Sequence, residues 1–187
     1  LLSVSLAKGD NDTAKKLVST AYVSVGTIFS VLIILFLSAY NFVDWYKIVN
    51  APTAMANEIN ILVLFVVCLM CVNFILGVIK SVFFAFQEPQ KNSDMSLITQ
   101  ALSLLVVFIF SKVGRVDNLL PIGFTLTLIP CIVYFGYSVY FFAGRFKHVA
   151  PSFKHFDRQY IKKILLLGGG FFFIQIYNLL CFQSNEI

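Results

Sequence analysis

Five long apolar blocks dominate this chain and decide which folds are open to it. They cover residues 17–40, 59–86, 95–111, 119–143 and 164–184. Each block comes close to the ~20 residues that an α-helix needs to cross a hydrocarbon core about 30 Å thick. A membrane β-barrel would instead alternate apolar and polar residues in segments of about ten. The blocks therefore predict an all-α, polytopic membrane helix bundle with about five transmembrane helices.

The composition points away from a soluble domain. Hydrophobic residues make up 59% of the 187 residues and charged residues 12%, with a mean hydropathy of +0.86, whereas soluble domains are about one quarter charged. All four cysteines lie inside apolar blocks. Cys68 and Cys71 have a C-x-x-C spacing, but no second pair and no histidine accompany them, so we expect no metal, redox site or cofactor.

The two ends of the chain resemble cut points within a longer sequence. The opening "LLSVSLAKGD" has no initiator methionine and lacks the pattern of a signal peptide. The final residues, "CFQSNEI", fall at the end of the fifth apolar block. We therefore interpret the chain as an internal fragment.

The residues before the first block predict a helix start. Asp10 or Asp12 is expected to cap the helix, because short acidic side chains accept hydrogen bonds from its first N–H groups. Asp12 also stands four residues before Lys16, the spacing of an ion pair along a helix.

Basic residues gather in alternate connecting segments, which predicts the orientation. Segments 1–16, 88–94 and 145–163 contain ten lysines and arginines, whereas 41–58 and 112–118 contain three. The positive-inside rule places the first three segments in the cytoplasm. The net charge of +5 is then a signal of topology, and no nucleic-acid partner is expected. We interpret segment 145–163 as a juxtamembrane connector on anionic lipid, with contact to a charged substrate as the alternative.

One lysine interrupts the second block. Asn73, Lys80 and Gln87 are seven residues apart, nearly two helical turns, so they are predicted to share one helix face with Gly77. A charge at the bilayer centre costs about 2.5–3.5 kcal/mol on insertion scales. Two interpretations remain: the ammonium extends to the headgroups or packs between helices, or it contacts an anionic group of a substrate.

Other polar residues in the blocks are further candidates for a substrate cavity. Four amides lie inside later blocks, Gln100, Gln175, Asn178 and Gln183, and the first three are the cavity candidates. An amide is costly against lipid, so these side chains are expected to face other helices or a cavity. No Asp or Glu lies well inside any block, which argues against intramembrane acid–base chemistry.

Four residues weaken helical hydrogen bonding and are candidates for kinks or hinges: Pro130, Gly168, Gly169 and Gly170. A kink at mid-membrane fits helix movement during transport, although static kinks occur as well.

Three phrases of the sequence carry a family resemblance. "LAKGDNDTAKKLVSTAY", "DWYKIVNAPTAMANEINILVLF" and "PSFKHFDRQYIKKILLLGGGFFFIQIYNLLCFQSN" resemble the bacterial polysaccharide flippases. These are the O-antigen and capsule lipid-linked oligosaccharide transporters of the multidrug/oligosaccharidyl-lipid/polysaccharide exporter superfamily. The similarity extends over the whole chain, although three consecutive glycines and Glu186 depart from the family pattern.

The resemblance implies an architecture and a location. Two helical lobes would surround a central cavity, with 1–144 as the third to sixth spans of the N-terminal lobe. Residues 145–163 would form the cytoplasmic connector between the lobes, and 164–187 would open the C-terminal lobe. The implied location is the bacterial inner membrane.

The resemblance further implies a transporter, not an enzyme. It would flip an undecaprenyl-pyrophosphate-linked oligosaccharide by alternating access, for polysaccharide and O-antigen biosynthesis. Its partners would be that lipid, the bilayer and other membrane proteins of polysaccharide assembly. Two alternatives remain. A cation-coupled multidrug exporter of the same fold would need intramembrane carboxylates. A membrane-embedded polymerase or acyltransferase would need clustered His, Asp or Arg near one membrane face; His148 and His155, seven residues apart in a basic segment with Asp157 nearby, are a weak match and are better explained as surface residues.

Overall fold

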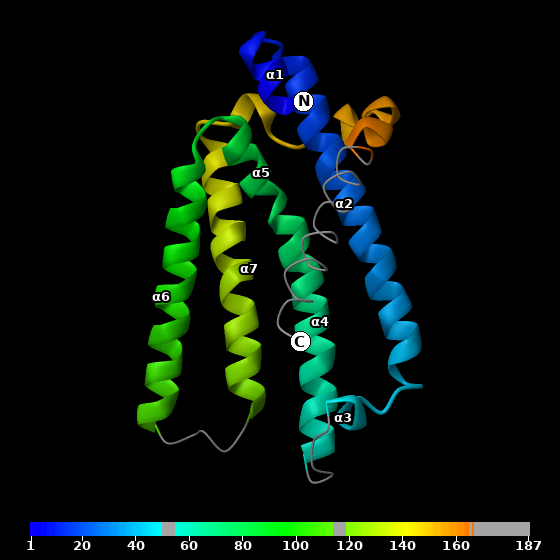
Figure 1. Ribbon diagram of the computed structural model, residues 1–187, viewed down its shortest axis with the longest axis vertical. Coiled ribbons are helices and arrows are strands. Elements are labelled where there is room, and N and C mark those ends of the chain that lie inside the picture. The colour runs from blue at the N-terminus through cyan, green and yellow to red at the C-terminus, as the bar shows by residue number, and fades with distance from the viewer. Residues whose placement is uncertain (50–54, 114–118, 165, 167–187) are drawn as a thin grey trace, which may run out of the picture.

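The fold of this chain is helical throughout its described part. The computed structural model describes residues 1–49, 55–113, 119–164 and 166, and within these ranges it contains no strand (Figure 1). Four helical spans are long and apolar enough to cross a membrane. The predicted all-α, multi-pass class is thus confirmed for the described residues. Of the fifth predicted span, the three glycines Gly168 to Gly170 and the amides Gln175 and Asn178 lie outside them.

The four described spans comprise four long helices and one short one: α2 (Asn11–Tyr40), α4 (Ala56–Leu76) continued by the short α5 (Val78–Ala85), α6 (Pro89–Val113) and α7 (Leu119–Ala143). Shorter elements connect them: α1 (Leu2–Ala7), α3 (Trp45–Ile48), and the 3-10 helices η2 (Lys147–Val149) and η3 (Phe153–His155).

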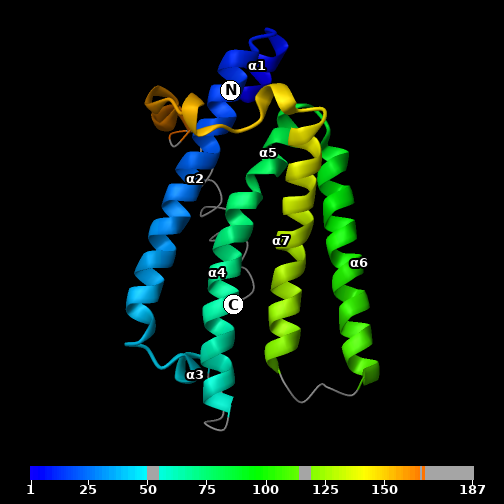
Figure 2. The same ribbon diagram turned by 180° about the vertical axis from the view of Figure 1, so that it is seen from behind.

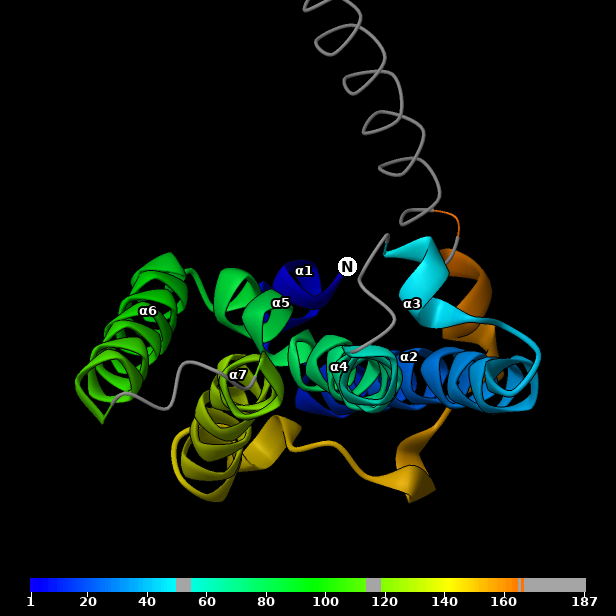
Figure 3. The same ribbon diagram turned by 90° about the horizontal axis from the view of Figure 1, so that it is seen from below.

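The spans form a single curved row in the order α2, α4, α7, α6, which Figure 3 shows along the bundle. α4 packs against both α2 and α7, and α6 packs against α7. Most of each span is open to its surroundings rather than buried in protein. The two broad faces of the row are therefore the surfaces that lipid or further helices would cover.

The connecting segments sort into two ends (Figures 1 and 2). α1, the α5–α6 connection and the 145–163 connector lie at one end, which we call the α1 end; α3 lies at the other. The three segments that hold ten basic residues thus meet at one end, as alternating spans require. That this end is cytoplasmic remains a prediction. Segment 88–94 is mostly helical, because Pro89 begins α6 and proline suits a first helical position.

The α1 end holds the main apolar core. Phe83 of α5 is fully buried and meets Phe141 edge to face at 4.9 Å between ring centroids. Phe86 stacks on Phe146 at 4.1 Å. An ion pair of 2.6 Å between Arg145 and the mostly buried Glu88 also joins the residues that follow α7 to the α5–α6 connection. The helices accordingly converge at this end and spread towards the other (Figure 1).

The start of α2 follows the sequence prediction. The Asp10 carboxylate accepts a 3.0 Å hydrogen bond from the Thr13 N–H, which caps the helix. Lys16 lies 2.8 Å from Asp12. Because the cap acts here, α2 begins at Asn11, six residues before the first apolar block.

Candidate functional site

The second predicted span is two helices separated by a glycine. α4 ends at Leu76, and the Gly77 N–H still donates to the Asn73 carbonyl at 2.8 Å. α5 then begins at Val78, with the Lys80 N–H donating to Gly77 at 3.0 Å. The break falls between Asn73 and Lys80, the two polar residues of the predicted face.

Both of these polar residues line one half-open groove with a volume of about 300 Å³. We call it the Lys80 groove, and its lining residues are Met70, Asn73, Phe74, Gly77, Lys80 and Tyr134. Four of them come from α4 and α5, Gly77 lies between these two helices, and Tyr134 comes from α7. The groove therefore lies where α7 meets the break in the second span.

Lys80 is the only charged residue in the five apolar blocks. Its Nζ donates a 2.5 Å hydrogen bond to the Tyr134 hydroxyl and lies 4.2 Å from the centroid of that ring. No ion pair includes Lys80 in the described part of the chain. An ammonium group has three donors, so two of them are left for water or a ligand.

Asn73 adds an acceptor to the same groove. Its Oδ1 atom is buried, yet it has no hydrogen-bond partner within the described residues. Leaving a buried amide oxygen without a hydrogen-bond partner costs about 1–3 kcal/mol of stability. The groove thus offers two ammonium protons, which suit a ligand with anionic oxygens, and its wall contains an amide whose oxygen is enclosed by protein.

Gln87 does not reach this groove, although it continues the seven-residue spacing. α5 ends at Ala85, and Gln87 adopts a left-handed backbone with φ of +58°. The N–H groups of Glu88 and Gln87 donate to Phe83 and Phe84, at 2.9 and 3.1 Å. These two bonds close a Schellman motif, in which glycine usually occupies the position of Gln87. The side chain of Gln87 is consequently exposed on the α5–α6 connection.

Gln100 and Pro130 also lie apart from the Lys80 groove. Gln100 is exposed on α6, in a shallow apolar surface with Leu97 and Leu104. α7 is continuous from Leu119 to Ala143, through Pro130. A break in a span is found at Gly77 instead, a position that was not among the predicted kinks or hinges. A hinge role for Pro130 remains a prediction.

Tyr134 is the groove residue that sequence reasoning missed. A buried tyrosine hydroxyl usually finds a hydrogen-bond partner, so a tyrosine within an apolar span indicates that a polar group lies nearby. It does not indicate which residue supplies that group. Here the partner, Lys80, is 54 residues away in the sequence. No spacing pattern connects two such positions.

Two observations bound the chemistry of the described residues. In the ranges that the structure covers, no three His, Cys, Asp or Glu side chains gather closely enough to hold a metal ion. No model of a known family, no curated protein and no solved structure matches the chain. The groove is therefore interpreted from its own chemistry.

Proposed function

We propose that the protein is a membrane transporter that flips an undecaprenyl-pyrophosphate-linked oligosaccharide across the bacterial inner membrane by alternating access. The observation that carries the proposal is the Lys80 groove, which combines an ammonium group without a carboxylate partner in the described residues and an unsatisfied amide. The resemblance to polysaccharide flippases supplies the substrate class.

The charge of Lys80 fits a pyrophosphate group. Lysine binds phosphate as a point charge and donates hydrogen bonds that are stronger than those between neutral groups. A charged side chain in a membrane span is costly, so such residues generally serve substrates, ions or paired charges. The described part of the chain gives Lys80 a tyrosine hydroxyl and no carboxylate. An anionic ligand would complete its coordination.

The size of the groove fits a headgroup rather than a whole lipid. A volume of about 300 Å³ lies at the lower end of the range for small-molecule sites. Rotation of the Asn73 side chain would bring its now buried Oδ1 into reach of a sugar hydroxyl. The polyprenyl tail would leave the half-open groove and remain in the bilayer beside the row of helices.

The position of the groove fits loading from the cytoplasmic side. Lys80 lies in α5, the short helix that ends at the α1 end of the bundle (Figure 1). If this end is cytoplasmic, as the basic segments predict, the groove lies near the leaflet in which lipid-linked oligosaccharides would be loaded. Release at the other leaflet would require the lobes to reopen there.

A reconstitution assay tests this function. The full-length protein in liposomes should transfer a fluorescent lipid-linked oligosaccharide between leaflets faster than protein-free vesicles. Asn73→Leu removes the amide while keeping the branching of the side chain and should slow transfer. Asn57→Leu is the matched control, because Asn57 is exposed in the first turn of the same helix, α4. Drug efflux without lipid transfer would refute the proposal in favour of a multidrug exporter.

A further inference from the structure

A second and larger groove lies along α2, apart from the Lys80 groove. Its volume is about 560 Å³, and apolar atoms form most of its walls. α2 supplies one long wall, Ile75 of α4 another, and Pro151 to Phe153 of the connector close one end. We call this cavity the α2 groove.

Small residues on α2 keep the α2 groove open. Ser19, Gly26, Thr27 and Ser30 all line it. A Cβ atom placed on Gly26 would meet nothing within 4 Å. No protein atom of the described residues therefore fills the space above Gly26, which lies within a membrane-spanning helix. In a bilayer such a space fills with hydrocarbon.

The connector fixes the closed end of the α2 groove. The Ser152 N–H donates a 3.0 Å hydrogen bond to Ser19 Oγ, and Ser19 is fully buried. Phe153 follows, lining the groove while 87% of its surface remains exposed.

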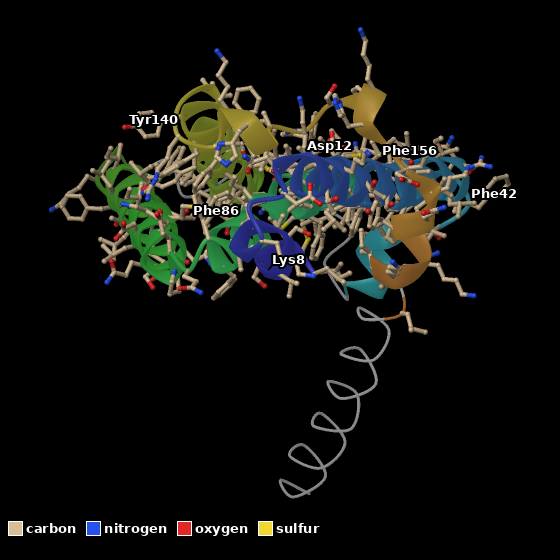
Figure 4. All side chains as sticks on the ribbon, turned by 90° about the horizontal axis from the view of Figure 1, so that it is seen from above. Lys8, Asp12, Phe42, Phe86, Tyr140 and Phe156 are labelled. Carbon is tan, nitrogen blue, oxygen red and sulfur yellow. The ribbon has the colours of Figure 1, made fainter. Side chains whose placement is uncertain are left out.

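Two lysines of the connector flank, in the sequence, the residues that close this end. Lys147 in η2 and Lys154 in η3 are exposed, and both 3-10 helices pack on α2. Neither lysine takes part in an ion pair among the described residues. Figure 4, which views the α1 end, shows nitrogen-tipped side chains extending outward from the connector. The apolar groove thus ends at a connector whose two exposed lysines form no ion pair among the described residues, while Asp157 of the same connector is held against Thr20 of α2.

We propose that the α2 groove binds an acyl chain of an anionic phospholipid, whose phosphate contacts Lys147 and Lys154. The chemistry of the site matches both halves of such a lipid, because hydrocarbon fills the apolar groove and phosphate pairs with the lysines. Basic sites beside membrane helices bind anionic headgroups in this way. The site is separate from the Lys80 groove and does not depend on transport.

The test compares retention of two lipids by the full-length protein. The protein is placed in nanodiscs that contain equal amounts of phosphatidylglycerol and phosphatidylcholine, extracted in mild detergent and examined by native mass spectrometry. We expect phosphatidylglycerol to be enriched. Each Lys→Gln change at 147 or 154 should lower the enrichment about fivefold, the factor that corresponds to about 1 kcal/mol per lysine near a membrane surface.

Matched variants separate the groove from general effects. Gly26→Leu fills the groove and should abolish the enrichment, whereas Gly136→Leu should not, because Gly136 is an exposed glycine of α7 that also faces open space. Lys47→Gln, on α3 at the other end of the bundle, should leave retention unchanged. The lysine variants alter only exposed positions, so they keep the test valid if Gly26→Leu does not fold.

Three results would overturn the proposal. Equal retention of the two lipids would remove the anionic specificity. Unchanged enrichment in the variants at Lys147 and Lys154 would separate the lysines from binding. Replacement of bound phosphatidylglycerol by polyprenyl phosphate at low molar ratio would instead assign the groove to the tail of the transported lipid.

Discussion

The attachment of the connector to α2 leads to a quantitative prediction. Thr20 is fully buried, and its Oγ1 accepts a 3.1 Å hydrogen bond from the Asp157 N–H while donating to the Asp157 carbonyl at 3.4 Å. Thr20→Val keeps the shape of the side chain but removes both bonds. Each backbone group that is left without a hydrogen-bond partner costs about 1–3 kcal/mol when it is buried. Asp157 is only half-buried, so water compensates part of this loss.

We therefore expect Thr20→Val to favour local opening of the connector by about 2 kcal/mol, or about 30-fold. Hydrogen–deuterium exchange of peptides covering residues 150–158, in the full-length protein in nanodiscs, measures this opening. Thr20→Ser retains the hydroxyl and should preserve protection. Thr27→Val is the control, because within the described residues the Thr27 hydroxyl bonds only to Val23 of its own helix, at 2.8 Å. Equal protection in the Thr20→Val and Thr27→Val proteins would refute the reasoning.

Two further predictions concern helix contact and acidity. A Cβ on Gly123 of α7 would lie 2.6 Å from Leu62 Cδ1 of α4. Gly123→Leu should therefore lower the thermal midpoint of the solubilised protein by roughly 2–10 °C. A midpoint equal to that of Gly136→Leu would contradict this contact. The hydrogen bond from Thr13 lowers the pKa of the Asp10 carboxyl below its ordinary value of 3.8. The stability from this cap is therefore present above pH 3.8 and is lost as the pH falls through the lowered pKa. Asp10→Asn caps without titrating, so hydrogen exchange at the start of α2 should lose this acid dependence; the same dependence in both proteins would disprove the role of Asp10.

Span positions were the most predictable part of the fold. The first block was expected to end at Tyr40, and α2 ends there. The fourth block agrees with α7 at both ends, Leu119 and Ala143. Long apolar runs are sufficient for such predictions, because the bilayer sets a minimum length for each helix. The break at Gly77 was not predicted, since a single glycine in an apolar run does not reveal whether the helix continues.

The neighbours of each span were beyond sequence reasoning. Side chains that face lipid and side chains that face protein are both apolar in a membrane helix, so the pattern does not show which helices meet. The contact between Lys80 and Tyr134 joins positions 54 residues apart. Gln87 left the predicted face because α5 ends in a left-handed turn that usually requires glycine. The predicted polar face therefore kept Asn73 and Lys80 and gained a residue from α7.

The flipping rate of Lys80 variants tests the central proposal most directly. At equal protein levels in liposomes, Lys80→Ala should reduce transfer of the lipid-linked oligosaccharide by about 10- to 100-fold, since a hydrogen bond to a charged group contributes about 1.5–3 kcal/mol. Lys80→Arg should retain part of the rate, and Lys112→Ala, an exposed lysine at the far end of α6, should retain all of it. Transfer by Lys80→Ala at the wild-type rate would contradict the proposed role of Lys80.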